Sequence, residues 1–465
     1  MSTVDGDGLE QSLYEVRRKI YPRAVHGAFA RWRWGLVLAT QLVFYGTAWL
    51  QWNGRQALLF DLAARKFYIF GLVFWPQDFV YLAVLLVVSA LSLFLFTAIA
   101  GRLWCGYACP QTVYTEIFIW IERAIEGDHV SRAKLDRSSA SARKTGLKAA
   151  KHAVWIALSL WTGFTFVGYF TPIRGLASSV ASLSLGPWET FWLLFYGFAT
   201  YGNAGWMREQ VCKYMCPYAR FQSAMFDRDT LIITYDPARG EPRGARGRKA
   251  DPRALGLGDC IDCDICVQVC PTGIDIRKGL QYECIGCAAC IDGCDQVMAK
   301  MNYAPGLIRY STLNAIDGHW DWKRMVARVR RPRVMIYTAI LGAIVLAAGI
   351  SLLLRSPLKM DVIRDRGTLA REVEGGRIEN VYRLQVMNTL ERPQRFTLSA
   401  RAPGALGDLE LLADPQPIEI AATTTRAIAV RVRAQPGAPR GSQPIEFTLA
   451  TPDARVVEKS RFIVP

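Results

Sequence analysis

Two consecutive cysteine runs place the strongest constraint on how this chain can fold. Their segment, Cys260 to Cys294, reads CIDCDICVQVCPTGIDIRKGLQYECIGCAACIDGC, which is the spacing C-x2-C-x2-C-x3-C written twice. Three thiols two residues apart let one tight loop surround a compact inorganic group, and a remote fourth thiol then ties the two runs together. The sequence therefore predicts a small domain whose core is built on metal ligands.

The spacing predicts two [4Fe-4S] clusters, because bacterial ferredoxins take three thiolates of each cluster from one such run and the fourth from the other. On this logic, one cluster is held by Cys260, Cys263, Cys266 and Cys294. The other is held by Cys284, Cys287, Cys290 and Cys270. Asp295 stands where a second proline usually follows, and we expect this departure to affect the loop and not the ligation. Two zinc sites of four thiolates each are the alternative, and they leave the C-x3-C spacings without a purpose.

Five apolar segments predict a polytopic α-helical membrane protein with soluble parts. Crossing a hydrocarbon core takes roughly 20 residues of helix, and 51% of the residues are hydrophobic, with a mean hydropathy of +0.13. The predicted transmembrane helices are Gly35–Asn53, Phe79–Gly101, Ala153–Pro172, Thr190–Met207 and Val334–Leu354. The second and fifth are the cleanest, whereas a buried helix of a soluble domain is the alternative for the first and the fourth.

The lysines and arginines predict the orientation, because basic loops stay on the cytoplasmic side of a membrane. With five crossings, residues 1–34, 102–152 and 208–333 share the basic side, so we expect them in the cytoplasm of a multi-pass protein of the bacterial inner membrane. The net charge of +16 largely reflects this topology, so we expect membrane lipid and no nucleic acid as a partner. All twelve cysteines lie on this side, where thiols stay reduced, and we expect ligands rather than disulfides.

The C-terminal region predicts an Ig-like β-sandwich, because apolar and polar residues alternate around Tyr382, Ile428 and Ile445 with Pro, Gly and Asn between the runs. It follows the fifth crossing, so we expect it in the periplasm. The segment Pro237–Gly258, rich in Gly, Pro and Arg, predicts a flexible linker. The whole organisation is an N-terminal cytoplasmic segment (1–34), a four-helix membrane region (35–222), a cytoplasmic linker with a two-cluster ferredoxin-like α+β domain (223–333), a fifth transmembrane helix (334–354) and the periplasmic domain (355–465).

Two further cysteine pairs, CGYACP and CKYMCP, follow the second and the fourth apolar segments. The spacing i, i+4 predicts that both sulfurs of a pair lie on one face of a helix, which ends or bends before the proline. Thiolates are soft ligands that favour Cu(I), Zn or iron–sulfur clusters. The candidate catalytic and copper-binding residues are Cys105, Cys109, Cys212 and Cys216. The alternatives are small buried hydrophobic residues, or one further metal site of four thiolates formed by both pairs.

Together, the tandem cluster motif, the two C-x3-C-P motifs, the five crossings and the Ig-like domain resemble the FixG/RdxA/CcoG family. The stretch SAMFDRDTLIITYDPARGEPRG is similar to that family as well. The resemblance implies an accessory protein of cbb(3)-type cytochrome c oxidase assembly. It implies an enzyme, a cupric reductase that converts Cu(II) to Cu(I) for the copper centre of the oxidase. The implied partners are copper ions, oxidase assembly factors or copper chaperones and transporters, and an unknown electron donor.

Two other functions compete with copper reduction. One is an electron-transfer polyferredoxin subunit that exchanges electrons with quinol or with periplasmic reductase systems. The other is a non-catalytic assembly scaffold whose sandwich binds a partner outside the membrane. Copper-dependent oxidation of the reduced protein separates the first function from these two.

Overall fold

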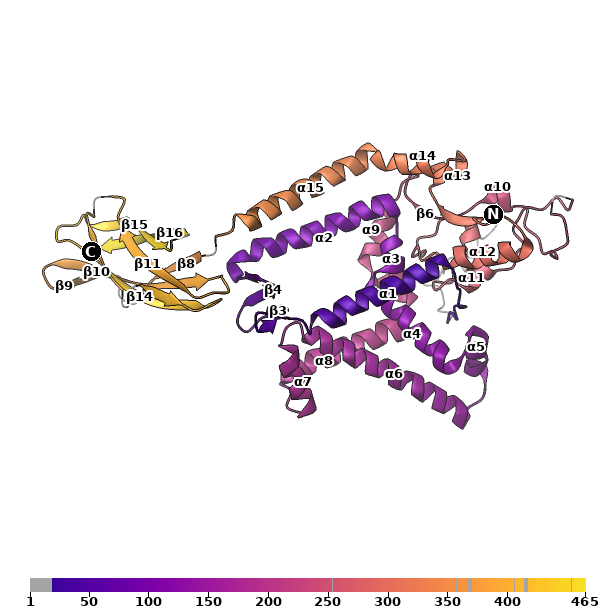
Figure 1. Ribbon diagram of the computed structural model, residues 1–465, viewed down its shortest axis with the longest axis horizontal. Coiled ribbons are helices and arrows are strands. Elements are labelled where there is room, and N and C mark those ends of the chain that lie inside the picture. Colours follow the sequence, from indigo (N-terminus) through magenta and orange to yellow (C-terminus); the bar gives the residue numbers. More distant parts are fainter. Residues whose placement is uncertain are drawn as a thin grey trace, which may run out of the picture. The chain divides into compact units, whose positions relative to one another are not determined.

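The computed structural model describes residues 19–465, except 253, 357, 366–369, 405, 414–416 and 453. Residues 1–18 of the predicted N-terminal segment therefore lie outside the described residues. The chain divides into two compact units. Unit 1 comprises Met1–Ala48, Val87–Tyr169 and Ile173–Leu341, and unit 2 comprises Trp49–Leu86, Phe170–Pro172 and Gly342–Pro465. Helices predominate in unit 1 and strands in unit 2 (Figure 1).

Unit 1 contains the long helices that precede the cysteine runs. They are α1 (Ala28–Thr47), α3 (Leu103–Tyr107), α4 (Pro110–Glu126), α5 (His129–Arg137), α6 (Ala142–Val167), α7 (Ile173–Ala181), α8 (Pro187–Thr200) and α9 (Pro217–Met225). Two π-helical stretches, η2 (Tyr201–Met207) and η3 (Val211–Met215), lie between α8 and α9. Gly163 allows α6 to pack closely on α8, because a Cβ there would lie 2.3 Å from the Leu193 carbonyl oxygen.

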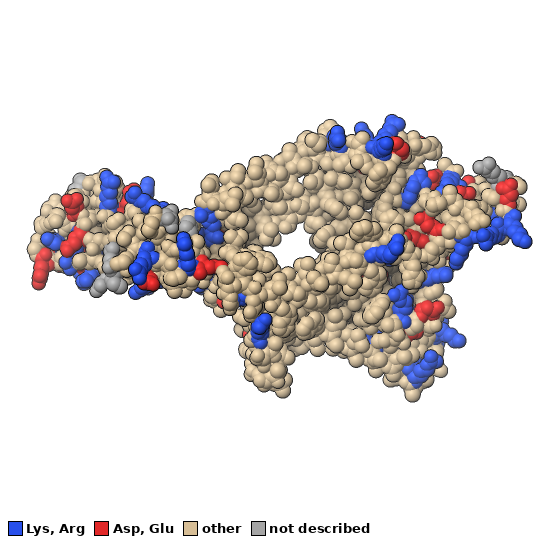
Figure 2. Space-filling view, in the orientation of Figure 1, with Lys and Arg blue, Asp and Glu red and all other residues tan. Residues whose placement is uncertain are grey.

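Two helices, not the predicted five, are long and apolar enough to cross a membrane among the residues that the structure describes. They are Pro76–Ala100, which includes α2 (Phe79–Ala100), and Pro332–Leu353, which is α15; their mean hydropathies are 2.7 and 2.3. Neither helix is buried along its apolar window, and the surface over both is largely free of charge (Figure 2).

The other three predicted crossings are helical but fall short of this requirement. Two arginines lie near the start of α1, α6 begins among basic residues, and α8 is an α-helix of only 14 residues before the π-helical stretches begin. The number of apolar residues in a segment does not reveal where its regular α-helix ends, as it does at Thr200 in α8.

The two cysteine runs form the small α+β domain that their spacing predicts. It contains α11 (Ile265–Gln268) and α12 (Ala289–Met301). Strands β6 (Ile232–Tyr235) and β7 (Ile308–Ser311) pair antiparallel, and Met298 and Leu307 are buried with three of the cluster cysteines in the core. Short helical segments surround it: α10 (Pro237–Gly240), Ile276–Lys278, α13 (Leu313–Asp317), α14 (Trp322–Ala327) and Arg328–Arg330.

The predicted linker Pro237–Gly258 instead packs against this domain. The Arg239 side chain donates to the Pro305 carbonyl at 2.9 Å and binds the Asp259 carboxylate at 2.6 Å. Arg246 donates to the Gly258 carbonyl at 2.6 Å, and its guanidinium lies over the ring of Tyr303. Arg239 and Arg246, which the composition suggested would lie in a solvated linker, therefore hold this segment in place.

Unit 2 contains the predicted β-sandwich. One sheet has the order β12–β14–β10–β8, with β9 paired to β10, and the other has the order β13–β11–β15–β16. Tyr382, Phe396, Phe447 and Phe462 are fully buried between the sheets. The strands are β8 (Leu358–Arg364), β9 (Arg371–Val373), β10 (Arg377–Asn388), β11 (Gln394–Arg401), β12 (Leu409–Leu412), β13 (Ile418–Ile420), β14 (Thr425–Ala434), β15 (Gly441–Ala450) and β16 (Arg455–Val464). The Ig-like prediction is confirmed.

Five short strands between α1 and α2 also belong to unit 2, and the sequence analysis did not predict them. They are β1 (Gln51–Trp52), β2 (Arg55–Gln56), β3 (Leu58–Asp61), β4 (Lys66–Ile69) and β5 (Leu72–Phe74). Arg55 forms a 2.5 Å ion pair with Glu391 of the sandwich, and Lys66 donates to the Thr423 carbonyl at 2.8 Å. Strands of two to four residues are too short to show a clear alternation.

Candidate iron–sulfur and thiol site

The four cysteines predicted for the first cluster line one cavity: Cys260, Cys263, Cys266 and Cys294. Asp262 and Asp264 both have left-handed backbone conformations, with φ of 54° and 55°, so the loop turns sharply between the first three thiols. The guanidinium of Arg277 fixes this loop by binding the carboxylates of Asp262, Asp264 and Asp275 at 2.7, 2.6 and 2.8 Å. The Arg277 side chain is only 7% exposed, whereas Asp262 and Asp264 are 47% and 60% exposed, so a buried guanidinium holds this loop through carboxylates at the surface.

The second predicted set also lines one cavity: Cys270, Cys284, Cys287 and Cys290. Cys266 of the first set lines this cavity as well. The two cavities are therefore neighbours. Burial raises the pKa of Cys284 to about 12. Ala288, with φ of 59°, precedes α12 and turns the chain between two of these cysteines.

The arrangement of these thiols fits iron–sulfur clusters better than single ions. Among the described residues, no three His, Cys, Asp or Glu side chains converge closely enough to hold one metal ion. Four thiolates on a zinc ion would converge in this way, whereas the ligands of a [4Fe-4S] cube bind separate irons and surround a cavity. The same observation gives no support to a mononuclear copper site.

Each C-x3-C-P pair lies across a break between two helices, not on one helical face. Cys105 belongs to α3, but Cys109 precedes Pro110 and is the N-cap of α4, with ψ of 128°. Cys212 belongs to η3, and Cys216 precedes α9 with ψ of 108°. The proline disfavours helical geometry in the cysteine before it, so the i, i+4 prediction was wrong for the second thiol of each pair.

The structure nevertheless brings the two pairs together. Burial raises the pKa of Cys105 to about 11 and that of Cys212 to about 12, and neighbouring thiols from both pairs contribute to each rise. Cys105 also lies 3.5 Å from the side-chain oxygen of Gln222, a buried residue of α9. We call Cys105, Cys109, Cys212 and Cys216 the thiol site.

The thiol site adjoins the second cluster cavity. Cys105 and Cys212 pack against the buried group formed by Val269, Ile285, Cys287 and Ala289. Gly106 makes this approach possible, because a Cβ there would lie 2.8 Å from the backbone nitrogen and Cα of Cys287. A side chain at Gly286, whose φ is 70°, would meet the Arg102 carbonyl oxygen at 3.0 Å. Backbone therefore meets backbone between the thiol site and the cluster loop.

We call the two segments that each end in a C-x3-C-P motif the two repeats. Three polar side chains join them around the thiol site. Gln111, which follows the first motif, donates to the carbonyls of Asn203 and Arg208 at 2.9 and 3.1 Å. Arg208 lies between the two π-helical stretches with φ of 46°, which is a strained conformation for a residue with a side chain. Its guanidinium binds the buried carboxylate of Glu122 at 2.7 Å. These contacts set the position of Cys212 relative to the first pair.

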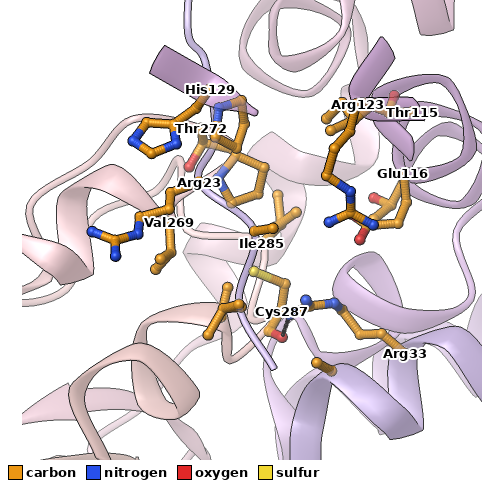
Figure 3. Close-up of a pocket in the computed structure, with 18 of the residues that line it drawn as sticks. Arg23, Arg33, Thr115, Glu116, Arg123, His129, Val269, Thr272, Ile285 and Cys287 are labelled. Carbon is orange, nitrogen blue, oxygen red and sulfur yellow. Dashed lines mark hydrogen bonds between the residues drawn. The ribbon is translucent and has the colours of Figure 1, made fainter. Parts of the chain in front are cut away.

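A cavity of about 640 Å³ reaches both the thiol site and the second cluster loop, because Cys212 and Cys287 contribute to its wall. Its other walls come from residues 22–27, α1 and α4. Figure 3 shows Arg33, whose guanidinium donates to the Cys287 carbonyl at 2.7 Å, and the neighbouring side chains of Glu116 and Arg123. One cysteine of the thiol site and one of the second cluster set thus face the same cavity.

Comparisons with known proteins agree with this arrangement. A family model described as 4Fe-4S dicluster domain matches residues 207–313, and one described as 4Fe-4S binding domain matches residues 82–127. A third, for the Ig-like fold at the C-terminus of FixG, matches residues 348–465. The nitrogen fixation protein FixG of Rhizobium meliloti is 39% identical over 86% of this chain and 82% of its own length. This chain belongs to the FixG/RdxA family.

Other members are similar along nearly their whole length. Protein RdxA of Cereibacter sphaeroides is 38% identical over 96% of this chain and 95% of its own length. A crystal structure of a FixG-related protein from Vibrio parahaemolyticus matches 23% of this chain and 97% of that chain, at 27% identity and a TM-score of 0.21. As a member of the FixG/RdxA family, the chain is a membrane-associated iron–sulfur protein with an oxidoreductase role.

Several residues of the site could not be found from the sequence. Arg33, Gln111, Glu122 and Arg208 are ordinary polar residues in helices or loops, and no spacing distinguishes them. Gly106 and Gly286 lie inside the cysteine motifs. A glycine next to a cysteine ligand can indicate that another backbone segment approaches closely there, and this was the one signal in the sequence.

Proposed function

We propose that this protein is a multi-pass membrane oxidoreductase that reduces Cu(II) to Cu(I) for the copper centre of a cbb(3)-type cytochrome c oxidase. The observation that carries the proposal is the packing of Cys105 and Cys212, from two separate repeats, against the loop that holds Cys287. Bound [4Fe-4S] clusters would supply one-electron reduction, and Cu(II) is a one-electron acceptor. The two cluster cavities would hold one such group each.

The thiol site is suited to the product of this reaction. Soft thiolates bind Cu(I) in preference to Cu(II), so copper held by these cysteines is easier to reduce. The thiols are buried and protonated when free, with pKa values raised to about 11 and 12 at Cys105 and Cys212. Copper binding therefore displaces protons from them. The cavity of about 640 Å³ provides the route by which copper reaches Cys212.

The proposed location follows from the basic residues. Five crossings of the inner membrane would place the cluster domain in the cytoplasm and the Ig-like domain in the periplasm. The periplasmic domain would then be free to contact oxidase assembly factors or a copper chaperone. The electron donor would be cytoplasmic or dissolved in the membrane.

A second candidate is an electron-transfer subunit in which the thiol site holds a third [4Fe-4S] cluster. Two observations favour it: the four thiols come together without converging on a single ion, and the family model that spans Cys105 and Cys109 describes a 4Fe-4S binding domain. In that case the chain would pass electrons on to a partner and copper would be no substrate.

The test is to replace the thiol site and measure iron and copper reduction together. The protein is purified anaerobically, reduced with dithionite, freed of excess reductant and mixed with Cu(II). We expect the double variant Cys105→Ser/Cys109→Ser to keep the iron content of the wild type and to lose most Cu(II) reduction, and the same for Cys212→Ser/Cys216→Ser. A loss of about four irons per chain would establish the third cluster instead. Wild-type copper reduction at full iron content would refute the copper role of these thiols.

A further inference from the structure

A second cavity of unit 1, of about 470 Å³, differs from the first in having no charged residue in its wall. Leucines, an alanine and aromatic rings form it, from α1, α3, the end of α2 and the segments around Leu231, Tyr310 and Trp322. Phe96 of the membrane-spanning candidate α2 is part of this wall. Because its wall is continuous with an apolar, exposed helix, we call this cavity the membrane groove.

One lining residue of the membrane groove, Tyr310, also contacts the second cluster loop. There Tyr310 donates a hydrogen bond of 2.7 Å to the carbonyl of Gly286, the residue before Cys287. The hydroxyl of Tyr107, in α3, lies 3.4 Å from that of Tyr310. These two hydroxyls are the oxygen-bearing side-chain groups of the wall, and they lie beside the cluster loop; the indole N–H groups of Trp32, Trp104 and Trp322 are the other side-chain donors.

We propose that the membrane groove binds a lipid-soluble quinol, which is the electron donor of this protein. This inference rests on the proposed function and names its reductant. An uncharged apolar wall excludes copper ions and charged nucleotides, because both would lose their hydration without compensation. A cavity of this size accommodates a ring and part of an apolar tail. A quinol combines that tail with a ring whose two hydroxyls can hydrogen-bond to Tyr107 and Tyr310.

A lipid acyl chain is the competing occupant of the groove. It would fill the apolar wall but would make no use of the tyrosine hydroxyls beside Gly286. A quinol can also release its two electrons in single steps, and an iron–sulfur cluster accepts one electron at a time. The balanced reaction is one quinol and two Cu(II) giving one quinone, two Cu(I) and two protons. Both quinol O–H bonds break, and the protons pass to water.

The first test measures binding to the full-length protein in detergent. Quinones quench tryptophan fluorescence, and Trp32, Trp104 and Trp322 line the groove. We expect saturable quenching by a quinone with a short alkyl tail. The substitution Leu36→Trp fills the groove from α1, and should raise the dissociation constant about tenfold or more, the scale of a steric change in an apolar pocket. Leu38→Trp adds the same residue to α1 away from the groove and should leave the constant within about twofold of the wild type.

The second test follows electrons. The matching short-tailed quinol should reduce the iron–sulfur clusters of the wild type, which gives an electron paramagnetic resonance signal, and should drive Cu(I) formation. Leu36→Trp should raise the half-saturating quinol concentration relative to Leu38→Trp, whereas reduction by dithionite should be the same in both variants. If dithionite supports Cu(II) reduction and quinol does not, the groove inference fails while the proposed function stands. If quinol reduces the clusters but Cu(II) never reoxidises them, the proposed function fails and the groove inference stands. Equal quinone affinity in the two tryptophan variants, or acyl chains that compete as strongly as quinone, would overturn the groove inference.

Discussion

Gly106 illustrates how one missing side chain can connect two sites. A Cβ at this position would lie 2.8 Å from the backbone of Cys287, which is closer than non-bonded atoms approach. Neither partner can yield easily, because α3 leads into Cys109 and the Cys287 loop lines a cluster cavity. The distance between the thiol site and the second cluster cavity therefore depends on this residue.

We predict that Gly106→Ala separates the thiol site from the cluster loop. Overpacking of this kind costs about 1–3 kcal/mol, so the thermal midpoint should fall. The rate of Cu(II)-dependent reoxidation of the dithionite-reduced protein should fall by a larger factor than the iron content does, because the clusters remain bound while the thiol site moves away from them. Gly146→Ala is the matched control, because nothing lies within 4 Å of a Cβ there and alanine is the better residue in a helix. Reoxidation of Gly106→Ala at the wild-type rate would show that this contact does not couple the two sites.

At the scale of elements, a buried ion pair holds the two repeats in register. Glu122 of α4 binds Arg208, which precedes η3, at 2.7 Å and Arg132 of α5 at 2.8 Å, with its own side chain 3% exposed. Burial alone would raise the pKa of Glu122, but Arg208, Arg132 and Lys151 outweigh it and hold that pKa below its ordinary value. The carboxylate therefore stabilises the fold when it is ionised.

We predict that this stability is lost in acid. Because the folded-state pKa of Glu122 is depressed, its contribution is complete above the ordinary glutamate value of 4.5 and declines as the pH falls through the lower folded value. Glu122→Gln should lower the free energy of unfolding at pH 7 by about 3–5 kcal/mol, the usual effect of breaking a buried pair, and this deficit should shrink as the pH falls below 4.5. Glu116→Gln, also on α4 but without an ion pair among the described residues, should show little change at either pH. An equal loss of unfolding free energy in both variants would show that the ion pairs of Glu122 do not stabilise the fold.

The same elements show what sequence reasoning can reach. Cysteine spacing predicts a ligand set for each cluster, because ligand geometry restricts the loop itself, and the members of each set line a common cavity, with Cys266 lining both cavities. A joint site of both cysteine pairs was one of the alternatives that the sequence left open, and the choice among them depends on the positions of α4, α8 and η3, which are set by side chains such as Gln111 that carry no pattern. The prediction that both thiols of a pair lie on one helical face was wrong because the proline disfavours helical geometry in the cysteine before it. The prediction of a flexible linker was wrong because a high arginine content does not show whether the arginines will bind backbone carbonyls of the neighbouring domain.

The whole molecule poses the question of how often the chain crosses the membrane. Two helices have the length and apolarity of a transmembrane segment, whereas the apolar segments of the sequence predict five crossings. The two possibilities differ at the turn between α7 and α8. With five crossings, this turn and α5 lie on opposite sides; with crossings at α2 and α15 alone, they lie on the same side.

We predict that a reporter placed at Leu183, a turn residue that is 93% exposed, is periplasmic, and that one placed after Arg137 is cytoplasmic. Alkaline phosphatase is active only outside the cytoplasm and green fluorescent protein fluoresces well only inside it, so each position is tested with both. A fusion after Pro465 should behave like Leu183, because the odd number of crossings places the Ig-like domain outside. If Leu183 and Arg137 report the same side, α6 and α8 do not cross, and the thiol site would lie at the surface of a helical domain attached to the membrane by α2 and α15. The membrane groove would survive that outcome, because Phe96 belongs to α2.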